Sequence, residues 1–195
     1  EKSLFKMEKA VYKKQFVYAS LSVIFIMFIG LFFLIPKTTQ NYNKEKAFEE
    51  AQRLVTYIKV FRSYYNSNIL TKIKQHTDLD VSFDHKTKST TVPLPATLVH
   101  DLGEIFTDSS ETKVQMYSNH PFPNRANRAL DNLQKNSLAS NKKFPNDPYV
   151  QEDFINGESF YRVAFPDFLT APSCVECNNT RADTPKHDWK LGDVR

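Results

Sequence analysis

The stretch FVYASLSVIFIMFIGLFFLI, residues 16–35, decides the architecture, because it holds no charged side chain in 20 consecutive positions. A helix of this length rises roughly 30 Å, which matches the hydrocarbon core of a bilayer. Fourteen of its residues are Leu, Ile, Phe or Val, and their insertion is favoured by about 4–8 kcal/mol as an upper estimate. We therefore predict a transmembrane helix over residues 16–35 rather than a buried core helix.

The charges around this segment predict its direction. Residues 1–15 form a basic tail with five Lys and two Glu, whereas residues 36–50 hold three charges of each sign. Because lysine-rich flanks stay in the cytoplasm, we expect a cytoplasmic N-terminus and a single span of the inner (plasma) membrane, with the main domain periplasmic or extracellular. The run exceeds the roughly 7–15 apolar residues of a signal peptide, and no small-residue cleavage motif follows, so an uncleaved anchor in the lipid bilayer is predicted.

Composition and motifs limit what the remaining chain can do. The net charge is +4, but residues 16–195 hold 21 basic and 20 acidic side chains, so no nucleic-acid partner is expected. The sequence has no Gly-rich phosphate loop, His-Glu-x-x-His or Gly-x-Ser-x-Gly element. We therefore predict no catalytic residues and no enzyme activity within it. It starts at Glu1 and ends in a polar segment, so we expect a fragment that lacks at least a closing strand, with any output enzyme beyond Arg195.

Residues 36–75 predict a long juxtamembrane amphipathic helix. Apolar side chains recur every three or four positions along it. Such a helix packs one stripe on the domain, and it either passes a displacement of the domain to the membrane span or serves for packing only. It is also the expected contact of a homodimer. The stripe consists of Ala47, Phe48, Ala51, Leu54, Val55, Ile58, Phe61, Tyr65, Ile69 and Ile73.

Residues 76–195 predict an extracytoplasmic domain of mixed helices and strands. The pattern has no regular alternation of strand and helix, which favours an α+β fold with an antiparallel sheet. The expected elements are a loop or hairpin at 76–91, helices at 95–106, 125–139 and 146–155, strands at 113–118 and 158–165, and a long final loop anchored by Trp189. The helix at 125–139 is expected to place Ala126, Leu130 and Leu133 on one face.

The motif SCVECNNT at residues 173–180 holds the only two cysteines, Cys174 and Cys177. A Cys-x-x-Cys-His motif would attach a c-type haem, but Asn178 occupies the histidine position. In an oxidising compartment the pair can instead form a disulfide. Free or metal-bound thiols are the third alternative, although a zinc site would need two more ligands and His187 with a nearby Asp is an unusual set. No metal site is predicted, nor a thioredoxin-like motif.

Several stretches together resemble the family of c-haem PAS-like extracytoplasmic sensor domains, first described as a domain of unknown function. They are FRSYYNSNIL, VQMYSNHPFPNRANRALDN, NGESFYRVAFPDF and CVECNNTRADTPKHDWKLGDVR, within residues 45–195. The resemblance implies a PAS-like antiparallel sheet flanked by helices. It also implies a domain that stands alone or precedes a nucleotide cyclase, histidine kinase or chemoreceptor-like output. In this family the cysteines carry haem and the histidine is the proximal ligand, so Asn178 departs from the pattern.

The resemblance implies a set of candidate binding residues around the motif. Cys174 and Cys177 are candidates for covalent haem or a disulfide, and His120 or His187 for a replacement axial ligand. Arg125, Arg162 and Arg195 have the bidentate fork that holds a haem propionate or another anionic ligand. The alternative for these arginines is a structural ion pair with Asp131, Asp167 or Asp193.

His76, His85 and His100 are expected to be surface residues. The predicted function is a sensory input domain that binds an unknown small molecule. The alternative is a membrane-tethered c-type cytochrome-like electron carrier, which would need haem.

Overall fold

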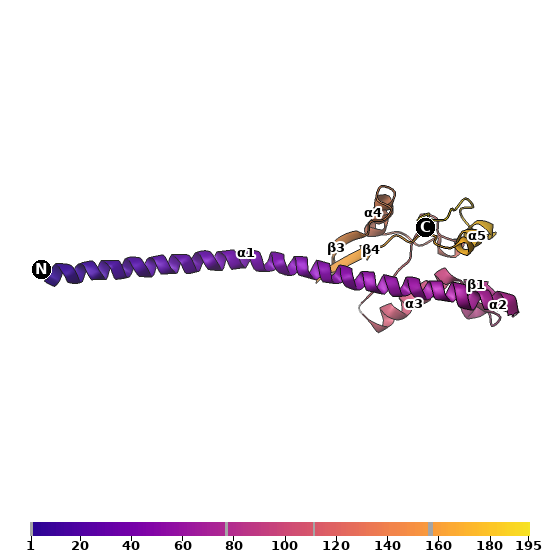
Figure 1. The fold of residues 1–195 in the computed structure, drawn as a ribbon, viewed down its shortest axis with the longest axis horizontal. Coiled ribbons are helices and arrows are strands. Elements are labelled where there is room, and N and C mark those ends of the chain that lie inside the picture. Colours follow the sequence, from indigo (N-terminus) through magenta and orange to yellow (C-terminus); the bar gives the residue numbers. More distant parts are fainter. Residues whose placement is uncertain (1, 77, 111, 156–157) are drawn as a thin grey trace. The chain divides into compact units, whose positions relative to one another are not determined.

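The chain folds into two compact units, Glu1–Ala47 and Phe48–Arg195, and one long helix belongs to both (Figure 1). The computed structural model describes residues 2–76, 78–110, 112–155 and 158–195. Helix α1 covers Lys2–Tyr64. The second unit combines helices with short strands, which confirms a mixed helix and strand fold.

The first unit is the apolar part of α1. Its large side chains are exposed, with 74% exposure for both Phe16 and Phe32. The hydroxyl of Ser20 donates a hydrogen bond of 2.9 Å to the carbonyl of Phe16, so this polar group is satisfied within the helix, as a bilayer requires. The helix is long and apolar enough to cross a membrane, and none of its described apolar window is buried. A buried core helix at residues 16–35 is therefore not supported.

The predicted juxtamembrane segment is helical, but it is not a separate helix. α1 continues through Pro36 without a break and ends at Tyr64. A π-helical segment, η1 (Tyr65–Leu70), follows, and α2 (Thr71–His76) completes the rod. π-Helical turns inside α-helices are frequently found at functional sites. η1 is therefore a candidate for a functional contact.

The predicted apolar stripe on this helix is confirmed at most of its positions. Ile58 is buried with 8% exposure, and Leu54 is half-buried. Phe61 and Ile69 are exposed by 66% and 40%, so the prediction is wrong for them. Arg62 rather than Phe61 faces the domain, because its guanidinium binds a carboxylate there. The helix therefore turns a narrower face toward the domain than its apolar pattern indicates.

The strands form two small sheets. β1 (Asp80–Ser82) pairs in parallel with β2 (Thr91–Pro93). β1 lies inside the region 76–91 expected to be a loop or hairpin, and β2 begins at its last residue. β3 (Tyr149–Ile155) pairs with β4 (Glu158–Ala164) as an antiparallel hairpin. The described strands thus give two sheets of two strands each, one of them parallel. The antiparallel PAS-like sheet is not confirmed.

Two expected elements are wrong because side-chain partners elsewhere decide the local structure. Residues 146–155 were expected to form a short helix, but β3 forms there because β4 returns beside it. Residues 113–118 were expected to form a strand, but no strand is assigned over residues 112–118. In this segment Tyr117 and Gln115 hydrogen-bond to side chains of a helix, at 2.8 and 3.1 Å, rather than joining a sheet.

Two helices lie on either side of that extended segment in sequence. α3 (Pro95–Ser109) confirms the helix predicted to start at Pro95. Its Gly103 allows a close approach, because a Cβ there would lie 2.4 Å from the carbonyl oxygen of Val114. α4 (Asn132–Asn141) begins seven residues later than predicted. Asp131 and Gln134 form a capping box that fixes this start.

The late start of α4 changes the predicted apolar face at residues 126–133. η3 (Pro123–Arg125) is a short 3-10 helix, and residues 126–131 follow it without helical structure. Ala126 and Leu130 therefore do not share a helix face with Leu133. Of the three, Leu133 is the buried residue, with 4% exposure.

The C-terminal region is more ordered than the predicted long loop. α5 (Pro172–Thr180) forms within it, helped by Pro172 at its first turn. The prediction that Trp189 anchors the region is confirmed, since its side chain is only 7% exposed. A bridge between Phe168 and Val194 and a turn at Gly192, with φ of +88°, bring the final residues back to the segment after β4.

Candidate functional site

Helix α5 presents both cysteines of the chain. Ala171 precedes the helix, and its carbonyl accepts the backbone N–H of Cys174 at 3.0 Å. Cys174 and Cys177 are three residues apart, so they lie on one face of the helix. Both are half-buried and free. Burial raises the pKa of the Cys177 thiol.

Asn178 is built into the same helix as a structural residue. Its side chain is 6% exposed, and its Nδ2 donates to the carbonyl oxygen of Cys174 at 2.7 Å. This bond ties the side chain to the backbone of the cysteine one turn earlier. The position where the haem family has its histidine is thus filled by an amide that bonds to the helix itself.

The two candidate histidines lie beside the segment that holds Trp189. The ring of His120 meets Trp189 edge-on, with centroids 5.7 Å apart. Nδ1 of His187 lies 2.8 Å from the carbonyl oxygen of Asn179. Asn179 also fixes the backbone of Trp189 with two hydrogen bonds of 2.9 Å. Both imidazoles are exposed.

A haem fits the cysteines but not position 178. Two thiols on one helix face match attachment through two thioether bonds, whereas the Asn178 amide is engaged with the backbone. His187 has the arrangement usual for metal-ligating histidines, in which one ring nitrogen bonds a carbonyl and the other is left for the metal. Within the described part of the chain, no group of three or more His, Cys, Asp or Glu side chains could hold a metal ion.

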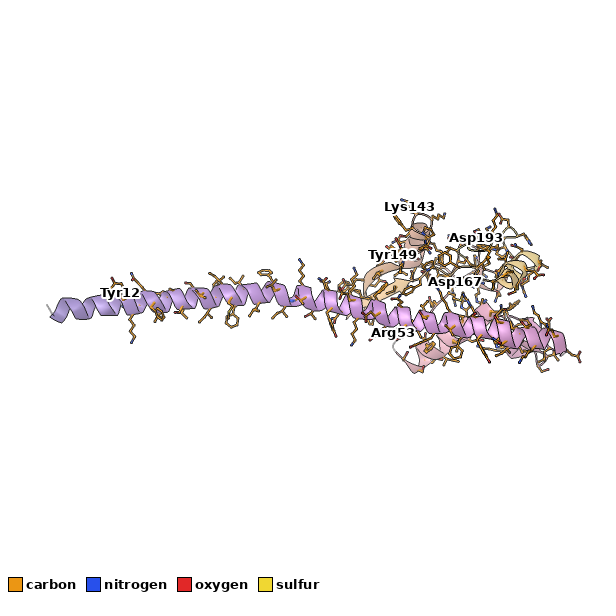
Figure 2. All side chains as sticks on the ribbon, viewed as in Figure 1. Tyr12, Arg53, Lys143, Tyr149, Asp167 and Asp193 are labelled. Carbon is orange, nitrogen blue, oxygen red and sulfur yellow. The ribbon has the colours of Figure 1, made fainter. Side chains whose placement is uncertain are left out.

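A half-buried ion-pair cluster joins α1 to the C-terminal region, and we call it the Arg62 cluster. Both terminal guanidinium nitrogens of Arg62 bind the carboxylate of Asp167, at 2.8 and 2.5 Å, and Arg195 binds the same carboxylate at 3.0 Å. Figure 2 labels Asp167 among the side chains. The side chains are 18% exposed for Arg62 and 19% for Asp167 and Arg195. Burial favours the neutral acid, but the two arginines outweigh it, so the pKa of Asp167 lies below its ordinary value.

This cluster lies within electrostatic reach of the cysteine motif. The pKa of Arg62 is raised, because Asp167 outweighs the effect of burial, and a Cys174 thiolate would act in the same direction. One turn along the rod, Nδ2 of Asn66 in η1 donates to Oγ of Ser173 at 3.1 Å. Ser173 is the residue before Cys174. The π-helical segment is therefore in direct contact with the first turn of the cysteine helix.

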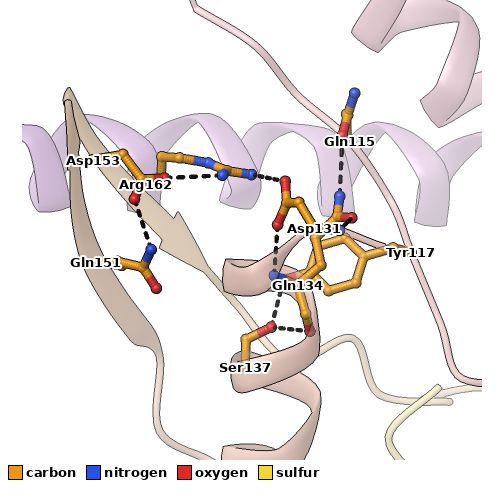
Figure 3. A network of polar contacts seen from close by, with 8 residues as sticks. All are labelled: Gln115, Tyr117, Asp131, Gln134, Ser137, Gln151, Asp153 and Arg162. Atoms are coloured by element: carbon orange, nitrogen blue, oxygen red, sulfur yellow. Dashed lines mark hydrogen bonds and ion pairs between the residues drawn. The ribbon is translucent and has the colours of Figure 1, made fainter. Parts of the chain in front are cut away.

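Arg162 is not available to hold a ligand in the way the resemblance implies. Its guanidinium binds Asp131 at 2.7 Å and Asp153 at 3.0 Å, and we call these residues the Arg162 cluster (Figure 3). Asp131 also caps α4 by accepting the N–H of Gln134. The structural ion pair expected as the alternative is thus confirmed for Arg162 with Asp131. It is likewise confirmed for Arg195 with Asp167.

Arg125 lies apart from the ion-pair clusters. The charges that act on it come from Arg128 and from Asp101 and Glu104 of α3, and burial is the main cause that lowers its pKa. Among the described residues, no hydrogen bond or ion pair holds its guanidinium. Its neighbour His100 is half-buried rather than on the surface as predicted, and burial together with Arg125 and Arg128 lowers its pKa to about 4.

Histidine 85 also departs from the predicted surface position. It is half-buried, and its Nε2 lies 3.2 Å from Oδ2 of Asp101. The side chain of His76 lies outside the described residues. The sequence thus singled out both cysteines, His120, His187 and Trp189, and the structure brings the two histidines to the segment that holds Trp189. The sequence missed Arg62, Asn66 and Asn179. The quoted motif FRSYYNSNIL, which contains Arg62 and Asn66, was the available signal for the first two.

Comparison with known proteins identifies the class to which this domain belongs. A model of the Tll0287-like family matches residues 40–195. The chain therefore belongs to the Tll0287-like family, which in general terms consists of c-haem PAS-like sensor domains. Comparisons with curated proteins and with solved structures gave no match.

Proposed function

We propose that this chain is the extracytoplasmic sensory input domain of a membrane-anchored signalling receptor, with the cysteine helix as its haem- or redox-linked element. The family match and the apolar, exposed N-terminal part of α1 support this function. The observation that carries it is the bond from Asn66 to Ser173, which links the cysteine helix to the helix that contains the membrane-spanning candidate. A change at the cysteines therefore has a direct route to α1.

The geometry of α5 explains how a redox change would produce a signal. Side chains three apart on a helix have Cβ atoms about 5–6 Å apart, whereas a disulfide needs about 3.5–4.5 Å. Joining Cys174 to Cys177 therefore draws the first turn of α5 together and moves Ser173. The two thiols give two electrons and two protons to a disulfide of a thiol oxidant, which is reduced in exchange.

If the domain carries haem, Cys174 and Cys177 would hold it and His187 or His120 would be the candidate axial ligand. The iron would then supply the redox and ligand-binding chemistry of a haem sensor. Asn179 would orient His187 through its carbonyl, and Trp189 would hold His120 by its ring contact. The chain's own residues in this arrangement would hold the group at the cysteines and orient the two histidines.

A haem stain on a denaturing gel tests whether the two cysteines carry haem or form a disulfide. The full chain is produced with haem-attachment machinery, beside its Asn178→His variant. We expect little covalent haem in the wild type. We also expect its cysteines to resist alkylation until their disulfide is reduced. We expect covalent haem in the variant, because the proximal imidazole completes the attachment signal.

The outcomes separate the two functions. If the wild type carries no haem, the electron-carrier function is excluded, and the redox-linked sensor is the function that agrees with the result. Strong staining of the wild type would contradict the disulfide and identify a haem protein with a replacement ligand. Labelling of the reduced cysteines by a membrane-impermeant thiol reagent in intact cells tests the topology. Labelling that requires cell lysis would contradict an extracytoplasmic domain.

A further inference from the structure

One face of α1 in the second unit has large apolar side chains that the domain does not cover. Tyr57, Val60, Phe61 and Tyr64 are 62%, 61%, 66% and 60% exposed. Contiguous exposed apolar side chains mark an interaction surface rather than ordinary surface residues. We call these four residues the aromatic stripe.

The spacing of the stripe matches a second helix rather than a flat surface. Tyr57, Val60 and Tyr64 follow one another at intervals of three and four residues, which is the seam of a two-stranded coiled coil. The opposite face of the same helix carries Ile58 and Arg62, which pack on the domain. The domain and the stripe therefore occupy different faces, and both can be engaged at once.

We propose that the aromatic stripe is the seam of a parallel homodimer, with a second copy of this chain as its occupant. The apolar half of α1 fixes both copies in one membrane with the same direction, so identical residues reach the same height. This step rests on the membrane anchoring proposed above. Tethering in a plane also raises the effective concentration of the partner.

Cysteine crosslinking of the full chain in native membranes tests the seam. Cys174 and Cys177 are changed to Ser, and single cysteines are introduced as Val60→Cys on the stripe and Ser63→Cys as the matched control. Both positions are exposed, but in a heptad with Tyr57 and Tyr64 at a and Val60 at d, Ser63 is a g position at the edge of the seam rather than in it. We expect at least about a tenfold excess of covalent dimer for Val60→Cys, because the stripe places the two copies of that residue in contact.

The adduct must have twice the mass of the chain. Equal crosslinking at Val60 and Ser63, no crosslinking at either, or an adduct with a different protein would each overturn the proposal. Subunit counting in lipid nanodiscs with the native cysteines retained gives an independent measurement. There Val60→Glu should convert dimers into monomers while Ser63→Glu leaves them intact, and dimers that survive Val60→Glu would contradict the seam. Neither readout depends on whether the domain senses a ligand.

Discussion

The Arg62 cluster and the Arg162 cluster have the same chemistry but different positions in the molecule. In the Arg162 cluster one arginine binds two carboxylates, and the three side chains are 25–45% exposed. In the Arg62 cluster two arginines share one carboxylate, and all three side chains are below 20% exposed. The Arg162 cluster joins β3, β4 and the cap of α4, whereas the Arg62 cluster joins α1 to the last residue of the chain. We infer that the first is a local structural contact and the second connects α1 to the C-terminal region.

The replacement Asp167→Asn should have the largest effect on stability. It leaves Arg62 and Arg195 largely buried without a carboxylate, and removal of one partner from such a cluster costs about 2–4 kcal/mol, below the full cost of a completely buried pair. Chemical denaturation of the variant measures the loss. Asp153→Asn in the Arg162 cluster is the matched control and should lose less. Equal losses would remove the distinction between the two clusters.

The pH dependence of stability distinguishes the contribution of His100 from that of the Arg62 cluster. The pKa of His100 is lowered in the folded state to about 4, so the unfolded chain binds the extra proton first and stability falls as pH drops from about 6.5 to 4. After allowance for solvent screening this loss is about 1–3 kcal/mol. The pKa of Asp167 is also lowered, so its contribution is lost only at more acidic pH. His100→Gln should flatten the denaturation midpoint between pH 6.5 and 4.5, and an unchanged slope would contradict this assignment.

The replacement Arg162→Ala should have a smaller effect. Its ion pairs are partly exposed, and such pairs contribute about 0.2–1 kcal/mol each. The capping box of α4 does not depend on the guanidinium, so the helix should remain. Thermal unfolding with a loss of about 1 kcal/mol and an unchanged helical circular dichroism signal would agree. A loss as large as that of Asp167→Asn would show that exposure does not decide the ranking.

The replacement Asn66→Ala should have the smallest effect on stability. It removes one exposed hydrogen bond to Ser173, and a change at such an exposed contact usually alters stability by about 0.5 kcal/mol or less. Its consequence should instead appear in the coupling between α5 and η1. Ser67→Ala is the matched control in the same π-helical segment. A large loss of stability in Asn66→Ala alone would mean that the bond is mainly structural.

The sequence predicted those features that follow from local pattern. The apolar run at residues 16–35, the start of α3 at Pro95 and the strand β4 each carry their own signal in composition or periodicity. The burial of Trp189 was also predicted, from its place in a quoted motif. For the candidate site, the sequence identified both cysteines and the two histidines that lie near Trp189.

The features that the sequence did not predict depend on partners far along the chain. Residues 149–155 form a strand because β4 pairs with them, and residues 113–118 remain outside the sheets because Gln115 and Tyr117 bond to α4. The contact between Asn66 and Ser173 spans 107 positions, so no local pattern shows it. Arg162 illustrates the same limit, since a sequence cannot show that two carboxylates already occupy a guanidinium.

The coupling between the cysteine helix and the anchoring helix is tested most directly by hydrogen–deuterium exchange on the full chain in lipid nanodiscs. Amide exchange over residues 65–70 is measured with the cysteine pair reduced and again with it joined as a disulfide. We predict a change in exchange rate of more than about threefold in the wild type. The reason is that forming the disulfide moves Ser173 and lowers the free energy of local opening by about 0.7 kcal/mol or more. We predict that Asn66→Ala abolishes the change while Ser67→Ala retains it. Identical exchange in the reduced and oxidised wild type would contradict the claim that this domain signals through α1.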